Sequence, residues 1–148
     1  MQPFGNPDIE RRNLALIHSL YPQYEEELQA VSISQNSYEI RKTGDRTYTC
    51  ELRNRGEQPA WIHGPGNPWN WAEAQIQQVH WNEQSTFVVF RPGLGYVPLT
   101  LYPNLRKGRH AQRMLLVEDR VDLFRLSLTL FDWTDVLRSD RTILLLTP

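Results

Sequence analysis

The pattern of apolar and polar positions begins with a helical period. Residues 7–20 repeat apolar side chains every three or four positions, which is the spacing of one helical face. The expected face consists of Ile9, Leu16 and Leu20, with Leu14 and Ile17 beside it. Asn6 is a residue type that caps helix N-termini, and Pro7 suits the first helical position. Pro22 ends the segment because a proline disfavours helical geometry in the residue before it. The pattern therefore predicts a helix over residues 7–20, followed by a short second helix in "PQYEEELQAVS".

The chain then changes to a period of two. Tyr48, Cys50 and Leu52 alternate with more polar residues, which is the pattern of a half-buried strand. The segments "SYEIRK" and "RTYTCELR" flank a turn that contains Gly44. We therefore expect a β-hairpin over residues 37–53, with Cys50 on its buried side.

The second half of the sequence also has a strand-like character. The runs "TFVVFR" and "YVPLTLY" flank the turn-forming "PGLG", and Pro98 would place the second run at a sheet edge. Two further short runs, "MLLVE" and "TILLL", are largely apolar. The segment "AEAQIQQVHW" fits either a helix or the start of a strand.

The segment "DLFRLSLTLF" has the cleanest alternation in the chain, with Phe124, Leu126, Leu128 and Leu130 on one side. This alternation predicts a strand, while a helix through Val121, Phe124, Leu128 and Phe131 remains the alternative. Asp132 is placed to cap a short helix in "WTDVLRS". Without a repeat or a long linker, residues 1–148 are expected to form a single α+β domain, an N-terminal helix packed on a mainly antiparallel β-sheet.

Composition and charge narrow the class of protein. The chain has 148 residues and a formal net charge of −1, so no overall field attracts it to nucleic acid or an anionic membrane. Cys50 is the only cysteine, which excludes an intramolecular disulfide and fits a reducing, cytoplasmic location. No apolar run approaches the roughly 20 residues that span a bilayer, and the N-terminus lacks the pattern of a signal peptide. We therefore expect neither a nucleic-acid partner nor a membrane.

Aromatic residues gather in the stretch "WIHGPGNPWNW", which is rich in Gly and Pro. The indoles in and after this stretch are Trp61, Trp69, Trp71 and Trp81. They suit three uses: a lid that completes the core, a groove for a peptide, or a platform for a sugar ring if Trp69 and Trp71 share one side of an extended segment. We expect some of them to be buried and others to anchor a protein partner.

A basic loop follows in "NLRKGRHAQR". Its cations are Arg106, Lys107, Arg109 and Arg113, next to His110. A solvated loop is the simplest interpretation of this cluster. The chain is slightly acidic overall and no aromatic residue interrupts the loop, so a docking patch for an acidic protein segment is preferred over RNA.

Catalytic and metal-binding patterns are absent from the sequence. The histidines are His18, His63, His80 and His110, and none has the H-E-x-x-H spacing that places two ligands on one helical face. The glycine-containing "GPG" and "PGLG" match neither a P-loop nor a dinucleotide fingerprint. We therefore predict no catalytic residue, no metal and no cofactor. The alternative is a small enzyme or a small-ligand protein, including a carbohydrate binder, with a pocket near the tryptophans that uses His63 or His80.

The segment "RRNLALIHSLYPQYEEEL", together with the later "NPWNWAEAQIQQVHWNEQ", resembles small soluble accessory proteins of photosynthetic bacteria, the carboxysome assembly factors among them. The resemblance contains no diagnostic motif, so no functional residue is transferred from it. It implies a non-catalytic, chaperone-like protein that binds a segment of a larger assembly. The predicted function is accordingly a protein-binding adaptor or assembly factor.

Overall fold

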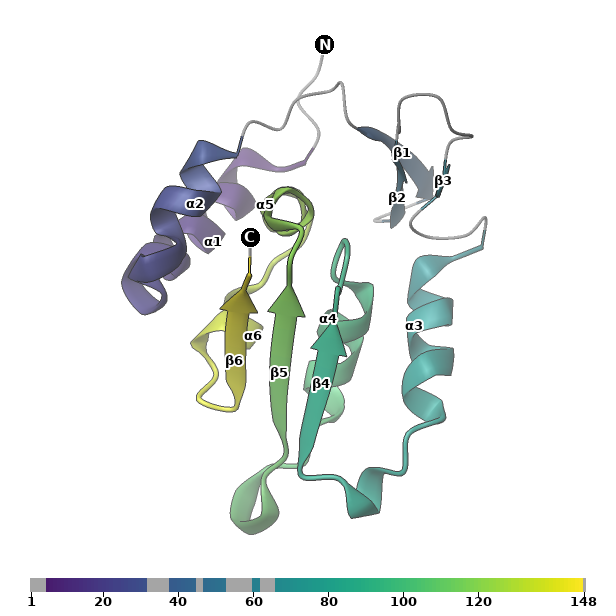
Figure 1. Cartoon of the computed structure of the whole chain (residues 1–148). Helices are drawn as coiled ribbons and strands as arrows, with labels where there is room; N and C mark the ends of the chain where they lie inside the picture. Colours follow the sequence, from purple (N-terminus) through teal and green to yellow (C-terminus); the bar gives the residue numbers. More distant parts are fainter. Residues whose placement is uncertain (1–4, 32–37, 45–46, 53–59, 62–65, 148) are drawn as a thin grey trace.

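The N-terminal helix has the bounds that its capping residues predict. A computed structural model describes residues 5–31, 38–44, 47–52, 60–61 and 66–147, and in it α1 spans Pro7–Leu20 (Figure 1). The Asn6 side chain accepts hydrogen bonds from the amides of Asp8 and Ile9, at 2.9 and 3.4 Å. The buried side of α1 is centred on Asn13 and Ile17, whereas Leu20 is 45% exposed. The expected face through Ile9, Leu16 and Leu20 is therefore wrong by a rotation of the helix.

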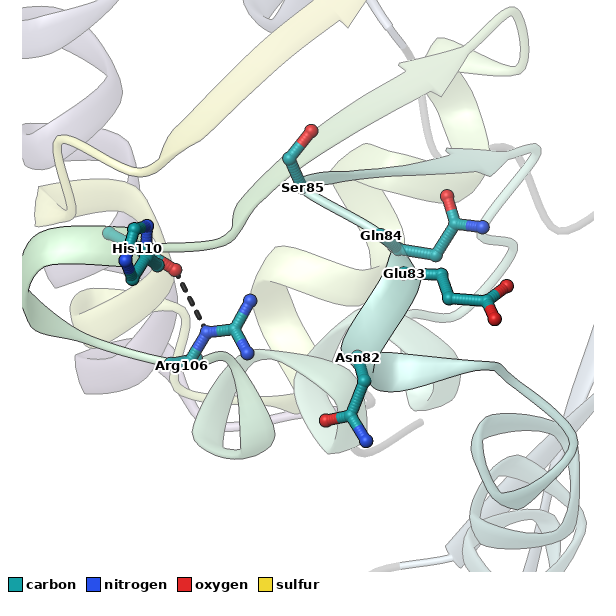
Figure 2. Close-up of a pocket in the computed structure, with 7 residues that line it drawn as sticks. Asn82, Glu83, Gln84, Ser85, Arg106 and His110 are labelled. Atoms are coloured by element: carbon teal, nitrogen blue, oxygen red, sulfur yellow. Dashed lines mark hydrogen bonds between the residues drawn. The ribbon is translucent and has the colours of Figure 1, made fainter.

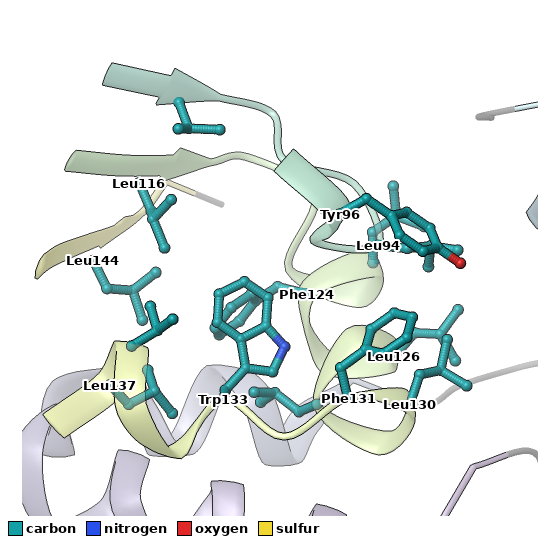
Figure 3. Packing of buried hydrophobic residues seen from close by; sticks show 14 of the residues in the cluster. Leu94, Tyr96, Leu116, Phe124, Leu126, Leu130, Phe131, Trp133, Leu137 and Leu144 are labelled. Atoms are coloured by element: carbon teal, nitrogen blue, oxygen red, sulfur yellow. The ribbon is translucent and has the colours of Figure 1, made fainter. Parts of the chain in front are cut away.

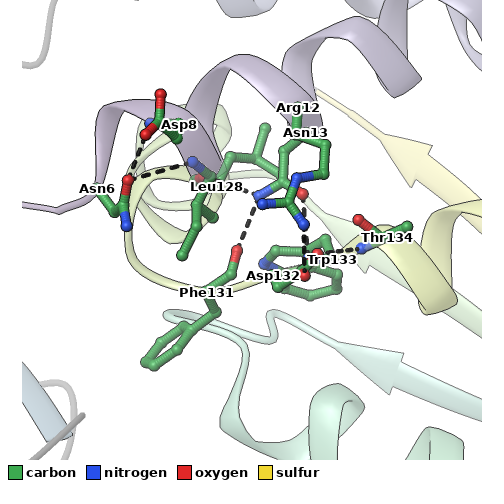
Figure 4. A network of polar contacts seen from close by, with 10 residues as sticks. Asn6, Asp8, Arg12, Asn13, Leu128, Phe131, Asp132, Trp133 and Thr134 are labelled. Atoms are coloured by element: carbon green, nitrogen blue, oxygen red, sulfur yellow. Dashed lines mark hydrogen bonds and ion pairs between the residues drawn. The ribbon is translucent and has the colours of Figure 1, made fainter.

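Asn13 explains that rotation, because its buried side chain binds the segment that joins α5 (Val121–Leu130) to α6 (Thr134–Arg138). Its Nδ2 donates to the carbonyls of Leu128 and Phe131, both at 2.8 Å (Figure 4). Its Oδ1 accepts from the amide of Trp133 at 3.1 Å. A buried amide with three partners fixes the orientation of α1 more strongly than an apolar stripe does.

The expected second helix and the expected hairpin are both confirmed. A single 3₁₀ turn, η1 (Pro22–Tyr24), leads into α2 (Glu25–Ala30), whose Leu28 is buried. Strands β1 (Tyr38–Gly44) and β2 (Thr47–Leu52) pair antiparallel, and β3 (Ala60–Trp61) adds to β2. Cys50 lies opposite Ile40 and is fully buried, as expected for this side of the hairpin. Residues 37, 45, 46 and 53 of the predicted hairpin lie outside the described residues.

The second half of the chain alternates helices with strands. Its elements are α3 (Pro68–Gln77), η2 (Trp81–Glu83), β4 (Thr86–Phe90), α4 (Tyr96–Leu101), η3 (Tyr102–Asn104), η4 (Gly108–His110), β5 (Arg113–Glu118), α5, α6 and β6 (Thr142–Leu146). The three strands are parallel and have the order β4-β5-β6. Parallel neighbours need crossover connections, and α4 and the pair α5–α6 supply them.

Two predicted strands are helices, and the parallel topology gives the reason. "DLFRLSLTLF" forms α5, so the alternative helix through Val121, Phe124 and Leu128 is correct. Nearly every side of α5 is buried, and a helix buried on all sides loses its amphipathic period. "YVPLTLY" forms α4, where Pro98 is in the first turn and its missing N–H costs no helical hydrogen bond. The ambiguous "AEAQIQQ" is part of α3, and the short helix expected after Asp132 is α6.

The core lies between the parallel sheet and the helices on one of its faces. Leu116 and Leu144 point from the sheet toward Trp133, which is completely buried (Figure 3). The Trp133 ring meets Phe124 edge-on at 5.5 Å between centroids, and its Nε1 donates to Ser127 Oγ at 3.0 Å. This aromatic residue therefore joins α5 and α6 to the sheet.

A second aromatic group connects the two sheets. The hydroxyl of Tyr96 accepts from the amide of Tyr48 at 2.6 Å and donates to its carbonyl at 2.7 Å, so α4 is tied to β2. Burial raises the pKa of Tyr96 to about 12, which keeps this hydroxyl a donor. The predicted α+β class, the N-terminal helix and an antiparallel sheet are confirmed. The structure adds a parallel sheet, and α1 packs against α5 and α6.

Candidate functional site

The parallel sheet has one face that the described part of the chain leaves in solvent. The side chains on this face, called here the open face, are Val88, Phe90, Leu115, Val117, Ile143 and Leu145. The register aligns them in two rows across the strands, with Val88, Leu115 and Ile143 in one row and Phe90, Val117 and Leu145 in the next. Val88, Phe90, Ile143 and Leu145 are 60, 65, 53 and 41% exposed. Parallel sheets normally have both faces covered, so an exposed apolar face on one is unusual.

Polar residues bound this face at both ends of the strands. At the amino ends, the exposed Arg113 pairs in register with Thr86. At the carboxyl ends, Arg91 and Asp119 form an ion pair with Nη2 and Oδ2 2.6 Å apart. The hydrogen bond from Arg91 lowers the pKa of Asp119. An apolar centre with a polar rim is the usual composition of a protein interface.

The two edges of the sheet differ. Along β6, the hydroxyls of Tyr21 and Tyr24 donate to the outward carbonyls of Thr142 and Leu144, each at 3.3 Å. This edge is therefore partly capped by the segment that follows α1.

Among the residues that the structure describes, none caps the edge formed by β4 in this way. Two hydrogen bonds to β5 bracket the strand, from the Arg113 amide to the Ser85 carbonyl at 2.9 Å and from the Arg91 amide to the Val117 carbonyl at 2.8 Å. Since backbone groups alternate in direction along a strand, those of Val88 and its neighbours two positions away point outward. Among the described residues no strand pairs with β4 on this side. We call this side the open edge.

A groove runs between the open edge and α3, which lies beside β4 (Figure 1). Its volume is about 290 Å³. Its lining side chains and backbone come from Trp71, Gln75, Val88, Val89, Phe90, Arg91, Pro92, Gly93 and Val97. Trp71 and Gln75 are one helical turn apart on α3, so they present neighbouring side chains to the groove. The Trp71 side chain is 51% exposed.

The loop after β4 closes one end of the groove. Arg91 has φ of 52°, a left-handed conformation that is uncommon for a residue other than glycine. Glu118 is buried, and its carboxylate accepts hydrogen bonds from the amides of Gly93 and Arg120 at 3.3 and 2.8 Å. Burial raises the pKa of Glu118 above its ordinary value, and the two backbone hydrogen bonds oppose that rise. The glycine-containing loop is therefore held by a carboxylate of the chain itself.

The structure separates the tryptophans that the sequence groups together. Trp69 is half-buried and meets Tyr96 and Phe131 edge-on, at 4.6 and 5.3 Å between ring centroids. Trp81 is half-buried too, and its Nε1 donates to the Ile76 carbonyl at 3.1 Å. Both side chains are partly buried and pack against the core, and their expected role as partner anchors stays a prediction.

The extended segment that a sugar-binding platform of Trp69 and Trp71 requires is not present at these residues. Asn67 caps α3 and Pro68 begins it, so Trp69 and Trp71 lie on a helix and not on an extended segment. Two residues apart on a helix, their side chains diverge by about 200°. Trp71 is exposed, while the side chain of Trp61 lies outside the described residues.

The basic loop lies at the amino ends of β4 and β5, away from the groove. Arg106, Lys107, Arg109 and Arg113 are exposed, as a docking or a solvated loop requires. Gln112 supports the loop, because it is buried, accepts from the Arg106 amide at 2.8 Å and donates to the Trp81 and Gln84 carbonyls. A shallow polar hollow of about 410 Å³ lies beside it, with Arg106 Nε donating to the His110 carbonyl (Figure 2).

The predicted histidine pair stays a prediction. His80 is exposed and His63 lies outside the described residues, so the structure does not test their pairing. No group of three or more metal-ligating side chains occurs among the residues that the structure describes. No helix in that part of the chain is long and apolar enough to cross a membrane.

The six open-face residues are the part of the site that the sequence analysis missed. Their signal lies in the runs "FVVF", "MLLV" and "ILLL", which are apolar at consecutive positions. Such runs are typical of parallel strands that are covered on both faces. Strands of this composition whose open face is exposed among the described residues indicate that a further layer or a partner covers that face.

Comparison with known proteins supports the fold and leaves the function open. Neither the protein-family models nor the curated proteins match the chain. It is similar in structure to the MAf glycosyltransferase from Magnetospirillum magneticum AMB-1, with a TM-score of 0.63 and 17% sequence identity. The match covers 97% of this chain and 28% of that protein, so the chain spans little more than a quarter of its length. A likeness at this identity shows a shared fold alone.

Proposed function

We propose that this chain is a non-enzymatic protein-binding module, an adaptor or assembly factor, which docks to a larger protein through the open face. The observation that carries the proposal is the exposure of Val88, Phe90, Ile143 and Leu145 on a parallel sheet. Exposed apolar patches with a polar rim mark interaction sites on soluble proteins. A partner that covers this face gives the sheet the second layer that such sheets normally have.

The order of the strands supports the same proposal. Counted along the chain, the sheet has the order third, second, first, which is that of one half of a doubly wound fold. In the complete fold a second half continues the sheet beyond the first strand and helices cover both faces. The glycosyltransferase with the similar fold is also a much longer protein, and the matched part is 28% of that protein.

The basic loop contributes charge to this surface. Arg113 lies at the amino end of β5. The loop that precedes it carries the exposed Arg106, Lys107 and Arg109. A partner with acidic residues near this end of the face is therefore favoured, through faster and more selective association. The resemblance to carboxysome assembly factors stays a prediction about which assembly is involved.

Capture of the partner with matched variants tests the proposed function. Tagged wild-type protein is compared with a variant that combines Ile143→Thr and Leu145→Thr, two exposed positions where threonine preserves strand propensity. The control is Leu20→Thr, which removes an exposed leucine from α1. Captured protein is identified by mass spectrometry, purified and titrated by calorimetry. We expect the double variant to bind at least about tenfold more weakly, and the control to bind as the wild type does. Equal affinity of all three proteins would contradict docking on the open face.

A second candidate function is small-ligand binding in the groove. Its supporting observation is the exposed Trp71 indole beside a groove at the carboxyl end of a parallel strand, where ligands of such folds bind. The glycosyltransferase name of the fold neighbour makes sugars and nucleotide sugars the compounds to test. Wild-type protein and Trp71→Phe are titrated with these compounds in a calorimeter. Saturable binding that depends on the indole would favour this candidate.

A further inference from the structure

We propose that the partner supplies an extended segment, which pairs with the open edge of β4 and lies in the groove over α3. This inference rests on the proposed function and specifies how the partner binds. It assigns the groove to a single added strand, in the manner of β-strand addition.

The backbone of β4 provides the first argument. The outward N–H and C=O groups of Val88 have no strand beside them in the described part of the chain, and Thr86 and Phe90 repeat the same orientation. Repeated donors and acceptors at this spacing are satisfied by another extended backbone. At the opposite edge, Tyr21 and Tyr24 occupy the equivalent carbonyls of β6, so the two edges are not interchangeable.

The position of α3 provides the second argument. α3 packs against α4 and continues the helix layer past β4 (Figure 1). Trp71 and Gln75 of α3, with Val97 of α4, line the groove beside the strand. One strand laid along β4 thus rests on a helical floor that is already present. This is also the place of the fourth strand in a doubly wound sheet.

The same helices argue against a second copy of this chain as the occupant. In an edge-to-edge pair, the α4 that lies behind β4 of one molecule would meet the α3 that lies beside β4 of the other molecule (Figure 1). A segment without a helix layer of its own has no such conflict.

The groove also indicates the chemistry of the segment. Side chains that point toward α3 meet the Trp71 ring and Val97, while those on the opposite side extend the row of Val88 and Phe90. Both sides are therefore apolar where they contact this chain. The Gln75 amide lies among the lining groups and is available to a polar group of the segment.

Substitutions at Val88 separate edge pairing from contact with the open face. Val88→Pro removes an outward N–H without removing a hydrogen bond to β5, and proline is tolerated on such an edge. Val88→Thr preserves the N–H and the shape of the side chain, and is its matched control. The probe is a random peptide library displayed on phage, selected on wild-type protein. Selected peptides are then synthesised and titrated against wild type, Val88→Pro, Val88→Thr and Trp71→Ala.

We expect peptides with apolar residues at successive positions of an extended segment. Their affinity should fall roughly tenfold or more in Val88→Pro and about thirtyfold in Trp71→Ala, with little change in Val88→Thr. Amide resonances report that the variants remain folded, and Trp71→Ala tests the groove without altering the strand.

Three results would overturn the inference: no selected peptide that distinguishes wild type from Val88→Pro, equal binding by Trp71→Ala, or a wild-type dimer that Val88→Pro dissociates. The last result would assign the edge to a second copy. Failure of the proposed function has a different signature, because it is measured by partner capture with the variant at Ile143 and Leu145 on β6, on the far side of the sheet from the open edge.

Discussion

Glu118 shows how one residue supports the architecture around the candidate site. Its carboxylate lies in the core at the end of β5 and accepts the amides of Gly93 and Arg120, so it joins the loop after β4 to the start of α5. Gly95 in the same loop has φ of 97°, and a Cβ there would overlap the Trp133 ring. The loop is therefore shaped by a buried carboxylate and a required glycine, both close to the groove.

The pH dependence of Glu118→Gln tests this arrangement. Burial raises the pKa of Glu118 above 4.5, so its contribution to stability is complete below about pH 4.5 and is lost as the pH rises through the folded-state pKa. The wild type should therefore lose stability relative to Glu118→Gln as the pH rises through this window. Urea unfolding of both proteins from pH 4 to neutral pH measures the difference. A constant difference across this range would show that Glu118 is not held in a desolvated site.

At the scale of the element, α3 places two nearby tryptophans in different surroundings. Trp69 packs on Tyr96 and Phe131, whereas Trp71 points to the groove. The start of α3 at Asn67 and Pro68 repeats the capping pair Asn6 and Pro7 of α1. That repeat was visible in the sequence, but the surrounding Gly and Pro residues favoured an irregular loop.

Alanine substitutions at the two positions should separate their roles. Trp69→Ala removes a ring from the aromatic group and should lower the free energy of unfolding by about 3 kcal/mol. Trp71→Ala removes an exposed ring and should change it by less than about 1 kcal/mol. Chemical unfolding measures both values. A loss for Trp71→Ala as large as that for Trp69→Ala would place its indole in the core.

The elements differ in how far their sequences predict them. α1, α2 and the β1–β2 hairpin depend on local caps, turns and periods, and they were predicted correctly. The strand predicted over α5 is wrong because this helix is buried on nearly all sides. It therefore has leucines at alternating positions, a pattern that fits a strand as well as a buried helix. The parallel pairing of β4, β5 and β6 depends on contacts between segments far apart in sequence, which no local pattern contains.

At the scale of the molecule, the central feature is a parallel sheet that the described part of the chain covers with helices on one side and leaves exposed on the other. Trp71, which lines the groove, could be singled out from the sequence, but the six open-face residues could not, because exposure depends on which face the helices cover. The basic loop was also visible in the sequence, and it is exposed at the other end of β4 and β5. The open face and the open edge meet at Val88 and Phe90, so one partner can engage both surfaces.

A methyl-resolved NMR titration with the captured and purified partner tests the docking surface most directly. We predict that the methyl signals of Val88, Leu115, Val117, Ile143 and Leu145 shift together, because they lie on the open face. Signals of the buried Ile17, Leu28 and Leu137 should stay in place, since these residues pack elsewhere in the core. Unchanged open-face signals, with the shifts confined to Ala111 beside the basic loop, would rule out docking on the open face and move the docking site to Arg106–Arg113.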